Sequence, residues 1–100
     1  MHQPRTDALT AAFDDVVRQV DRARAGGMRT LSGDDAAPRL ERLRADVLAQ
    51  RDVARQRGGV DPEWLRGTIR AVADWAPETD VTLLGALGAL ARARSGVSHR

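Results

Sequence analysis

Very few side chains in this chain could carry acid–base, nucleophilic or metal chemistry. Its 100 residues include no cysteine and no tyrosine, and its two histidines, His2 and His99, lie in terminal segments where no rigid shell of neighbours would hold them. Two adjacent acid pairs remain, Asp14–Asp15 and Asp34–Asp35. The first falls on the polar face of a predicted helix and the second at a predicted helix start. We therefore expect no catalytic residue, no cofactor and no metal ion, and we interpret the chain as non-enzymatic.

The basic residues offer a second chemistry, the binding of phosphates. All sixteen are arginine, but codon usage in a high-GC bacterium produces the same bias without selection for phosphate recognition. The net charge is only +2. Three arginines share one face of a predicted helix and others lie near the C-terminus, where they could track a phosphate backbone. The candidate nucleic-acid contacts are Arg44, Arg51, Arg55, Arg92 and Arg94.

Ion pairing accounts for the same arginines more simply. Glu41, Asp46 and Asp52 lie on the same predicted helix, and residues 34–60 carry six arginines against five acids. In the first predicted helix, Asp14 and Arg18 have the i,i+4 spacing of a solvated ion pair. Nucleic-acid binding is therefore the alternative interpretation.

These side chains must be positioned by helices, because apolar residues recur at helical spacing and no alternating strand pattern appears. We expect helices over residues 7–25, 36–57, 62–75 and 80–94, with residues 1–5 and 95–100 disordered. The chain is long enough for one core, so residues 1–100 form a single predicted domain. The predicted fold is all-α, a four-helix bundle-like domain with two long helices followed by a short αα-hairpin.

Local signals predict the helix boundaries. Gly26–Gly27 and Gly58–Gly59 supply left-handed C-caps. Asp34 or Asp35 is the predicted N-cap of the second helix, and Asp61 followed by Pro62 begins the third. Pro77 ends the third helix, and Thr79 or Asp80 is the predicted cap of the last. We expect Met28 and Leu31, in the linker, to close one end of the core.

Each predicted helix has an apolar face. The first uses Leu9, Phe13, Val16, Val17 and Val20, and the second a narrow line through Leu40, Leu43, Val47, Gln50 and Ala54. The third has two adjacent stripes, Trp64–Thr68–Ala71–Trp75 and Leu65–Ile69–Val72. We expect both tryptophans to organise the core together with Leu83, Leu87 and Leu90.

The last predicted helix is the least ordinary, because residues 81–91 carry no charge on any side. A helix that is apolar all round is buried all round, either by the other helices or partly by a partner. Gly85 and Gly88 cost helix stability, and a close helix contact would compensate for it. The tryptophans could pack over these glycines, or the face could meet a second chain. The candidate interface residues are Gly85, Gly88, Leu84 and Ala91.

We therefore expect a small helical module for protein–protein interaction or assembly, with itself as a homodimer or with another protein as partner. No uncharged run approaches the roughly 20 residues that cross a bilayer, and the absence of cysteine is compatible with a reducing compartment. We expect a cytoplasmic protein without a membrane partner.

Overall fold

The computed structural model describes residues 4–77 and 81–98 and is all-helical over them. These residues form four helices, α1 (Pro4–Ala25), α2 (Ala37–Arg57), α3 (Pro62–Trp75) and α4 (Leu83–Ser98). The described chain contains no strand beyond one isolated bridge between Arg29 and Asp35. The all-α prediction is confirmed. In the same described segments, no helix combines the length and the apolar composition needed to cross a membrane.

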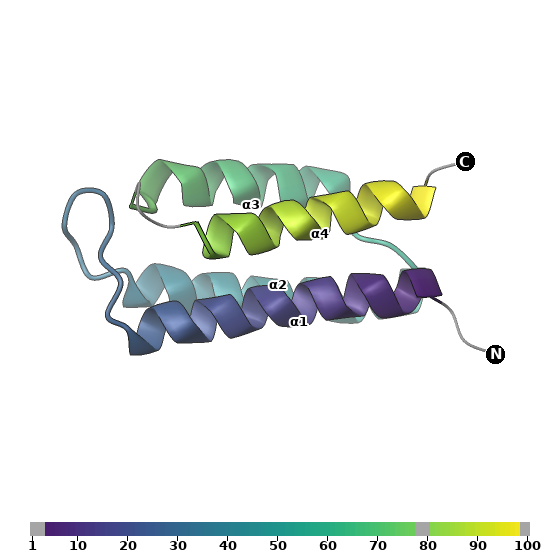
Figure 1. Ribbon diagram of the computed structural model, residues 1–100, viewed down its shortest axis with the longest axis horizontal. Helices are drawn as coiled ribbons and strands as arrows, with labels where there is room; N and C mark the ends of the chain where they lie inside the picture. The colour runs from purple at the N-terminus through teal and green to yellow at the C-terminus, as the bar shows by residue number, and fades with distance from the viewer. Residues whose placement is uncertain (1–3, 78–80, 99–100) are drawn as a thin grey trace.

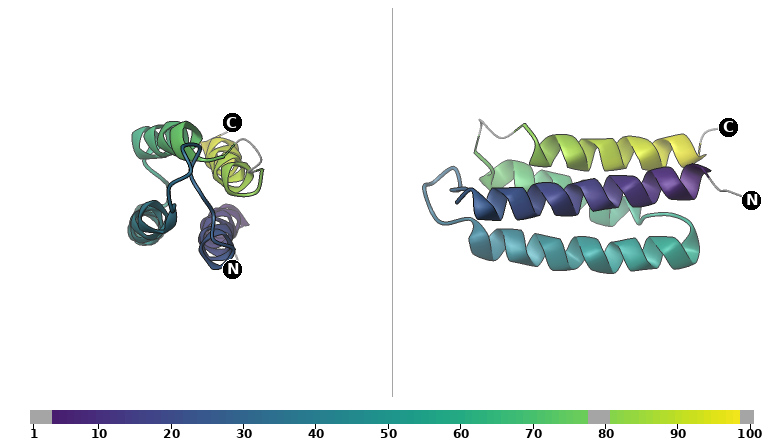
Figure 2. Two further views of the ribbon diagram at one scale, coloured as in Figure 1. Left: turned by 90° about the vertical axis from the view of Figure 1, so that its left-hand side faces the viewer. Right: turned by 60° about the horizontal axis from the view of Figure 1, so that its bottom comes forward.

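The four helices lie along a common long axis, with α1 beside α2 and α3 beside α4 (Figure 1). Seen end-on, the helices occupy the four corners of a square (Figure 2). α1 packs against both α2 and α4, and α3 packs against α4. Over their full described lengths, no Cα atom of α2 lies within 8 Å of one of α3. Packed helices have axes only about 8–10 Å apart, so the fourth side of the square is open at backbone level.

Ion pairs between α1 and α2 set the antiparallel register of these two helices. In each pair the two residue numbers add up to 65, as antiparallel alignment requires. The pairs are Asp14–Arg51, Asp21–Arg44 and Arg24–Glu41, with N···O distances of 2.6, 2.8 and 3.1 Å. The expected local pair of Asp14 with Arg18 is wrong, because Asp14 binds Arg51 and Arg18 pairs with Asp15 at 3.4 Å.

Most helix ends follow their local signals, but the prediction of Asp34 or Asp35 as the N-cap of α2 is wrong, because the N-cap is Ala36 and Asp35 only accepts from the Ala37 amide at 2.9 Å. After α1, Gly27 has φ 71° and the Met28 amide donates to the Ala23 carbonyl, which closes a Schellman motif. Asp61 caps α3 by accepting from the Glu63 amide at 2.9 Å. α1 begins at Pro4, earlier than expected, because proline is well tolerated in the first turn of a helix.

α4 is displaced along the sequence relative to its prediction. It begins at Leu83 instead of residue 80 and extends to Ser98 instead of residue 94. Val81 and Thr82 precede it, and their β-branched side chains disfavour helix. Gly96 lies inside the helix, because one interior glycine costs only about 1 kcal/mol. The predicted caps Thr79 and Asp80, and residues 1–3, 99 and 100, lie outside the described residues.

The core lies where α1 and α4 meet the inner faces of α2 and α3. Its largest fully buried side chains come from all four helices: Phe13, Val16, Val20, Leu40, Val47, Leu65, Val72, Leu83, Leu87 and Leu90. The expectation that both tryptophans organise this core is met only in part, because they pack against it without being fully buried. Trp64 and Trp75 are half-buried at its edge, and the Trp64 ring stacks on Phe13 with centroids 6.5 Å apart.

Candidate protein interface

A groove runs along the open side between α2 and α3. It has a volume of about 220 Å³ and is lined by Arg39, Arg42, Leu43, Asp46, Thr68, Ala71, Val72 and Trp75. On α3, the stripe of Leu65 and Val72 is buried in the core, whereas Thr68, Ala71 and Trp75 of the neighbouring stripe face the groove.

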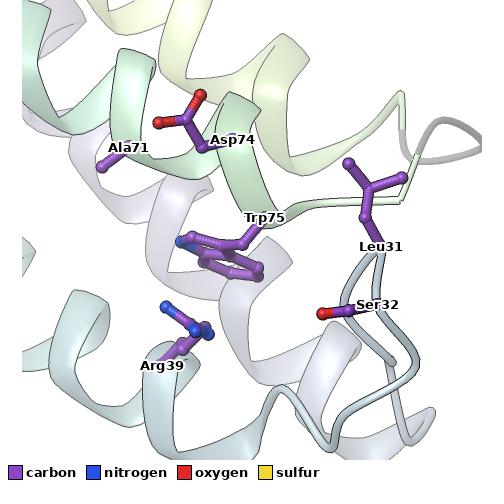
Figure 3. A pocket seen from close by; sticks show the side chains of 6 residues that line it. All are labelled: Leu31, Ser32, Arg39, Ala71, Asp74 and Trp75. Atoms are coloured by element: carbon purple, nitrogen blue, oxygen red, sulfur yellow. The ribbon is translucent and has the colours of Figure 1, made fainter.

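The groove opens at one end into a wider pocket of about 650 Å³ (Figure 3). Arg39 of α2 and Trp75 of α3 face each other across this pocket, with the guanidinium carbon 5.9 Å from the ring centroid. This is cation–π geometry. The pocket also includes Asp74 of α3 and Leu31 and Ser32 of the α1–α2 loop.

The loop that carries Leu31 is held by its own hydrogen bonds. The Thr30 amide donates to the Asp34 carbonyl at 2.8 Å, and the Asp34 amide donates to Thr30 Oγ1 at 3.1 Å. Gly33 supplies the turn with φ 93°. A further bond, from the Leu31 amide to the Trp75 carbonyl at 2.9 Å, ties the loop to the end of α3. The backbone at Leu31 is therefore fixed.

Large exposed apolar side chains of the described residues gather at this end of the molecule. Leu31 is 54% exposed and Val81, in the α3–α4 connection, is 76% exposed. The expectation that Leu31 closes the core is therefore wrong, although Met28 does pack partly buried against the core. Of the two exposed apolar residues, Leu31 lines the pocket, so part of the pocket wall is apolar and open to water.

Charged side chains of both signs border the groove. Arg39, Arg42, Asp46 and Asp74 make no ion pair with any side chain in the described part of the chain. This differs from the α1–α2 face, where three cross-helix pairs use up the charges. At the groove, Arg42 and Asp46 are therefore without an ion pair in the described residues, whereas Arg39 lies over the Trp75 ring and Asp74 lines the adjoining pocket.

The predicted α4 interface residues do not share one environment. Leu84 and Ala91 are half-buried and pack against the core, Gly88 is half-buried and Gly85 is exposed. A Cβ atom added at Gly85 would meet no described atom within 4 Å, and one at Gly88 would meet only Arg92 Nη1, at 3.6 Å. The expected close helix contact at these glycines is therefore absent from the described residues. Among the α4 residues up to Ala93, whose burial the structure describes, the buried side chains of Leu83, Ala86, Leu87 and Leu90 share one face.

The predicted nucleic-acid contacts are mostly occupied by acids. Arg44 and Arg51 bind Asp21 and Asp14 of α1, and Arg55 lies 4.0 Å from Asp52. Arg92 is exposed, whereas the side chain of Arg94 lies outside the described residues. The anticipated partners Glu41 and Asp46 do not bind these arginines, since Glu41 pairs with Arg24.

The arginines that border the groove were missed in the sequence. Arg39 and Arg42 are three residues apart on α2 and lie on the same side of it as Leu43. The sequence of α3 does carry one indication of the groove, because the small residues Thr68 and Ala71 separate two tryptophans in the same stripe. Small side chains between large ones leave room on a helix surface, and here that room is the groove.

Comparison of the chain with protein-family models, with curated proteins and with solved structures gives no match. The groove and its charged residues are therefore the features on which a proposed function rests. The acid pairs do not add a metal site to it, because the described residues contain no group of three or more His, Cys, Asp or Glu side chains that could hold a metal ion.

Proposed function

We propose that this protein is a small, non-enzymatic association module that assembles with a second copy of itself. The observation that supports the proposal is the groove between α2 and α3, where two consecutive helices joined by residues 58–61 stay apart instead of packing. A groove lined partly by apolar side chains, with a half-buried tryptophan, exposes surface that a second chain could cover. Its cysteine-free composition suits a cytoplasmic setting.

The molar mass in solution tests this proposal directly. Light scattering after size exclusion, over a range of protein concentrations, is expected to give a mass that rises from 10.9 kDa toward twice that value. The apolar floor of the groove predicts that moderate salt will not abolish association, because salt screens exposed charges but not apolar burial. A mass of 10.9 kDa at every concentration would contradict self-association.

Nucleic-acid binding is the weaker candidate, and no described contact favours it. Arg44 and Arg51 are held between α1 and α2 by carboxylates, so a phosphate would have to displace an existing ion pair. We expect no retardation of DNA or RNA in a gel-shift assay at low ionic strength, where phosphate contacts are strongest. Clear retardation would favour this candidate instead.

A further inference from the structure

We infer that two copies of the chain meet through the α2–α3 groove around a two-fold axis, with Arg42 of each chain paired to Asp46 of the partner subunit. This inference rests on the proposed self-association and names the surface and the pairing that produce it. In this arrangement α2 of one chain lies antiparallel to α2 of the other along the groove.

Apolar surface at the groove supplies the driving force for this contact. Leu43 and Val72 at its bottom are already buried within the monomer, so the surface that remains to be covered belongs to the half-buried Trp75 on its wall. Ala71 is exposed on the α3 edge and is small enough to let another helix approach. Burial of aromatic and aliphatic surface at the centre of a contact is what most stabilises protein interfaces.

The charges around the floor select a second copy as the occupant. Arg42 and Asp46 line the groove with opposite charges, so a partner of one sign would leave one of them without a counter-charge as the groove loses water. A two-fold contact avoids this problem, because each residue i that meets residue j also meets it in the reverse direction. An arginine and an acid one turn apart on the same helix edge are therefore complementary to the same two residues of a second copy.

Arg42 and Asp46 have the geometry that such a pairing needs. They lie one turn apart on α2, on the edge of the groove, and neither has a partner within the described chain. The order arginine then acid at i,i+4 is the weaker orientation for an ion pair within one helix, which leaves both groups available. When two α2 helices lie antiparallel with the axis passing between these residues, each arginine faces the other chain's carboxylate.

The face of α2 that points away from the groove already makes an antiparallel helix contact with ion pairs. It meets α1 in an antiparallel arrangement with Arg51 bound to Asp14 and Arg44 bound to Asp21, pairs of constant residue-number sum. The proposed contact repeats that arrangement with a second α2 in place of α1.

Charge reversal with complementation tests the pairing. Arg42→Asp places two acids on the edge and Asp46→Arg places two arginines there, so each variant alone is expected to associate at least about tenfold more weakly than the wild type. An equal mixture of the two restores opposite charges in both pairs. Native mass spectrometry separates the heterodimer from the two homodimers by mass, and we expect the heterodimer to dominate.

Matched controls separate this effect from a change in folding. Glu63→Arg and Arg66→Asp reverse exposed charges on α3 that do not line the groove, and both are expected to associate like the wild type. Circular dichroism should give all four variants a melting temperature near the wild-type value. If a reversal variant unfolds, Ala71→Arg tests the same surface by adding bulk to the α3 edge.

Each outcome has a distinct meaning. A wild-type dimer that both reversals leave intact would overturn the groove as the interface while self-association stands. Reversals that weaken the dimer without recovery in the mixture would overturn the Arg42–Asp46 pairing. A monomeric wild type would overturn the proposed function itself, and the inference with it.

Discussion

Arg51 Nη1 of α2 donates a 2.6 Å hydrogen bond to Asp14 Oδ1 of α1, a residue 37 positions earlier in the chain. The Arg51 side chain is only 26% exposed, so this contact is better shielded from solvent than the Arg18–Asp15 pair, whose arginine is 63% exposed. The bond fixes the alignment of α1 and α2, and through it the direction in which α2 presents its groove edge.

Removal of this pair should cost more than removal of a surface pair. We expect Asp14→Ala to lower the free energy of unfolding by about 1–2 kcal/mol, because it leaves a partly buried guanidinium without its partner. Asp15→Ala should cost no more than about 0.5 kcal/mol, since its pair with Arg18 is exposed. Urea unfolding measures both values, and equal losses would contradict a special role for Asp14.

Among the aromatic residues, substitution of Phe13 should lower the stability of the fold most. It is fully buried and stacks on Trp64, so Phe13→Ala should cost about 3–5 kcal/mol. A loss of that size approaches the whole stability of a small domain. Thermal unfolding by circular dichroism measures it, with Val81→Ala, at an exposed position, as a control that should leave the melting temperature unchanged.

The cap at the start of α3 can be tested without disturbing the core. Asp61→Ala removes the acceptor of the Glu63 amide and should cost about 1 kcal/mol. Asp61→Asn retains an oxygen at that position and should stay within a few tenths of a kcal/mol of the wild type. A similar loss for both variants would mean that the negative charge, and not the hydrogen bond, holds this end.

Substitution of alanine for each of two glycines should change the stability of the fold in opposite directions. Gly58 has φ 80° at the end of α2, so Gly58→Ala should destabilise the fold by about 1 kcal/mol. Gly85 lies inside α4 with open space around it, and Gly85→Ala should stabilise the fold by about 0.5–1 kcal/mol. If dimers form through the groove, Gly85→Ala leaves the dimer mass unchanged, whereas weakened association would place the interface on α4.

Fluorescence should report directly on the groove. The chain has two tryptophans, and Trp64→Phe leaves Trp75 as the only one. We expect its emission to shift to shorter wavelength as protein concentration rises, because association covers the accessible side of the ring. The Ala71→Arg variant serves as the control, and the same shift in that variant would mean that Trp75 senses something other than the groove contact.

The sequence predicted those features that depend on neighbours along the chain. Asp61 and Pro62 placed the start of α3 correctly, because a cap and a proline act within one turn. The i,i+4 spacing in the sequence predicts a pair between Asp14 and Arg18. Arg51 becomes the neighbour of Asp14 only when α2 folds back against α1. Residues 81–91 carried no charge to mark an outer face, so the exposure of Gly85 could not be read from them. The groove was missed for the same reason, since the distance between α2 and α3 depends on how both pack on α1 and α4.

The absence of a backbone contact between α2 and α3 leaves two helix pairs, α1–α2 and α3–α4, that are joined along the contact between α1 and α4. The groove lies on the side opposite that contact. It is bridged at one end by residues 58–61 and at the other by the hydrogen bond from the Leu31 amide to the Trp75 carbonyl. A small rotation of one helix pair relative to the other, about the α1–α4 contact, would widen or narrow the middle of the groove while each pair stays packed. Hydrogen exchange at the Leu31 amide would then report how often the bridge at that end opens.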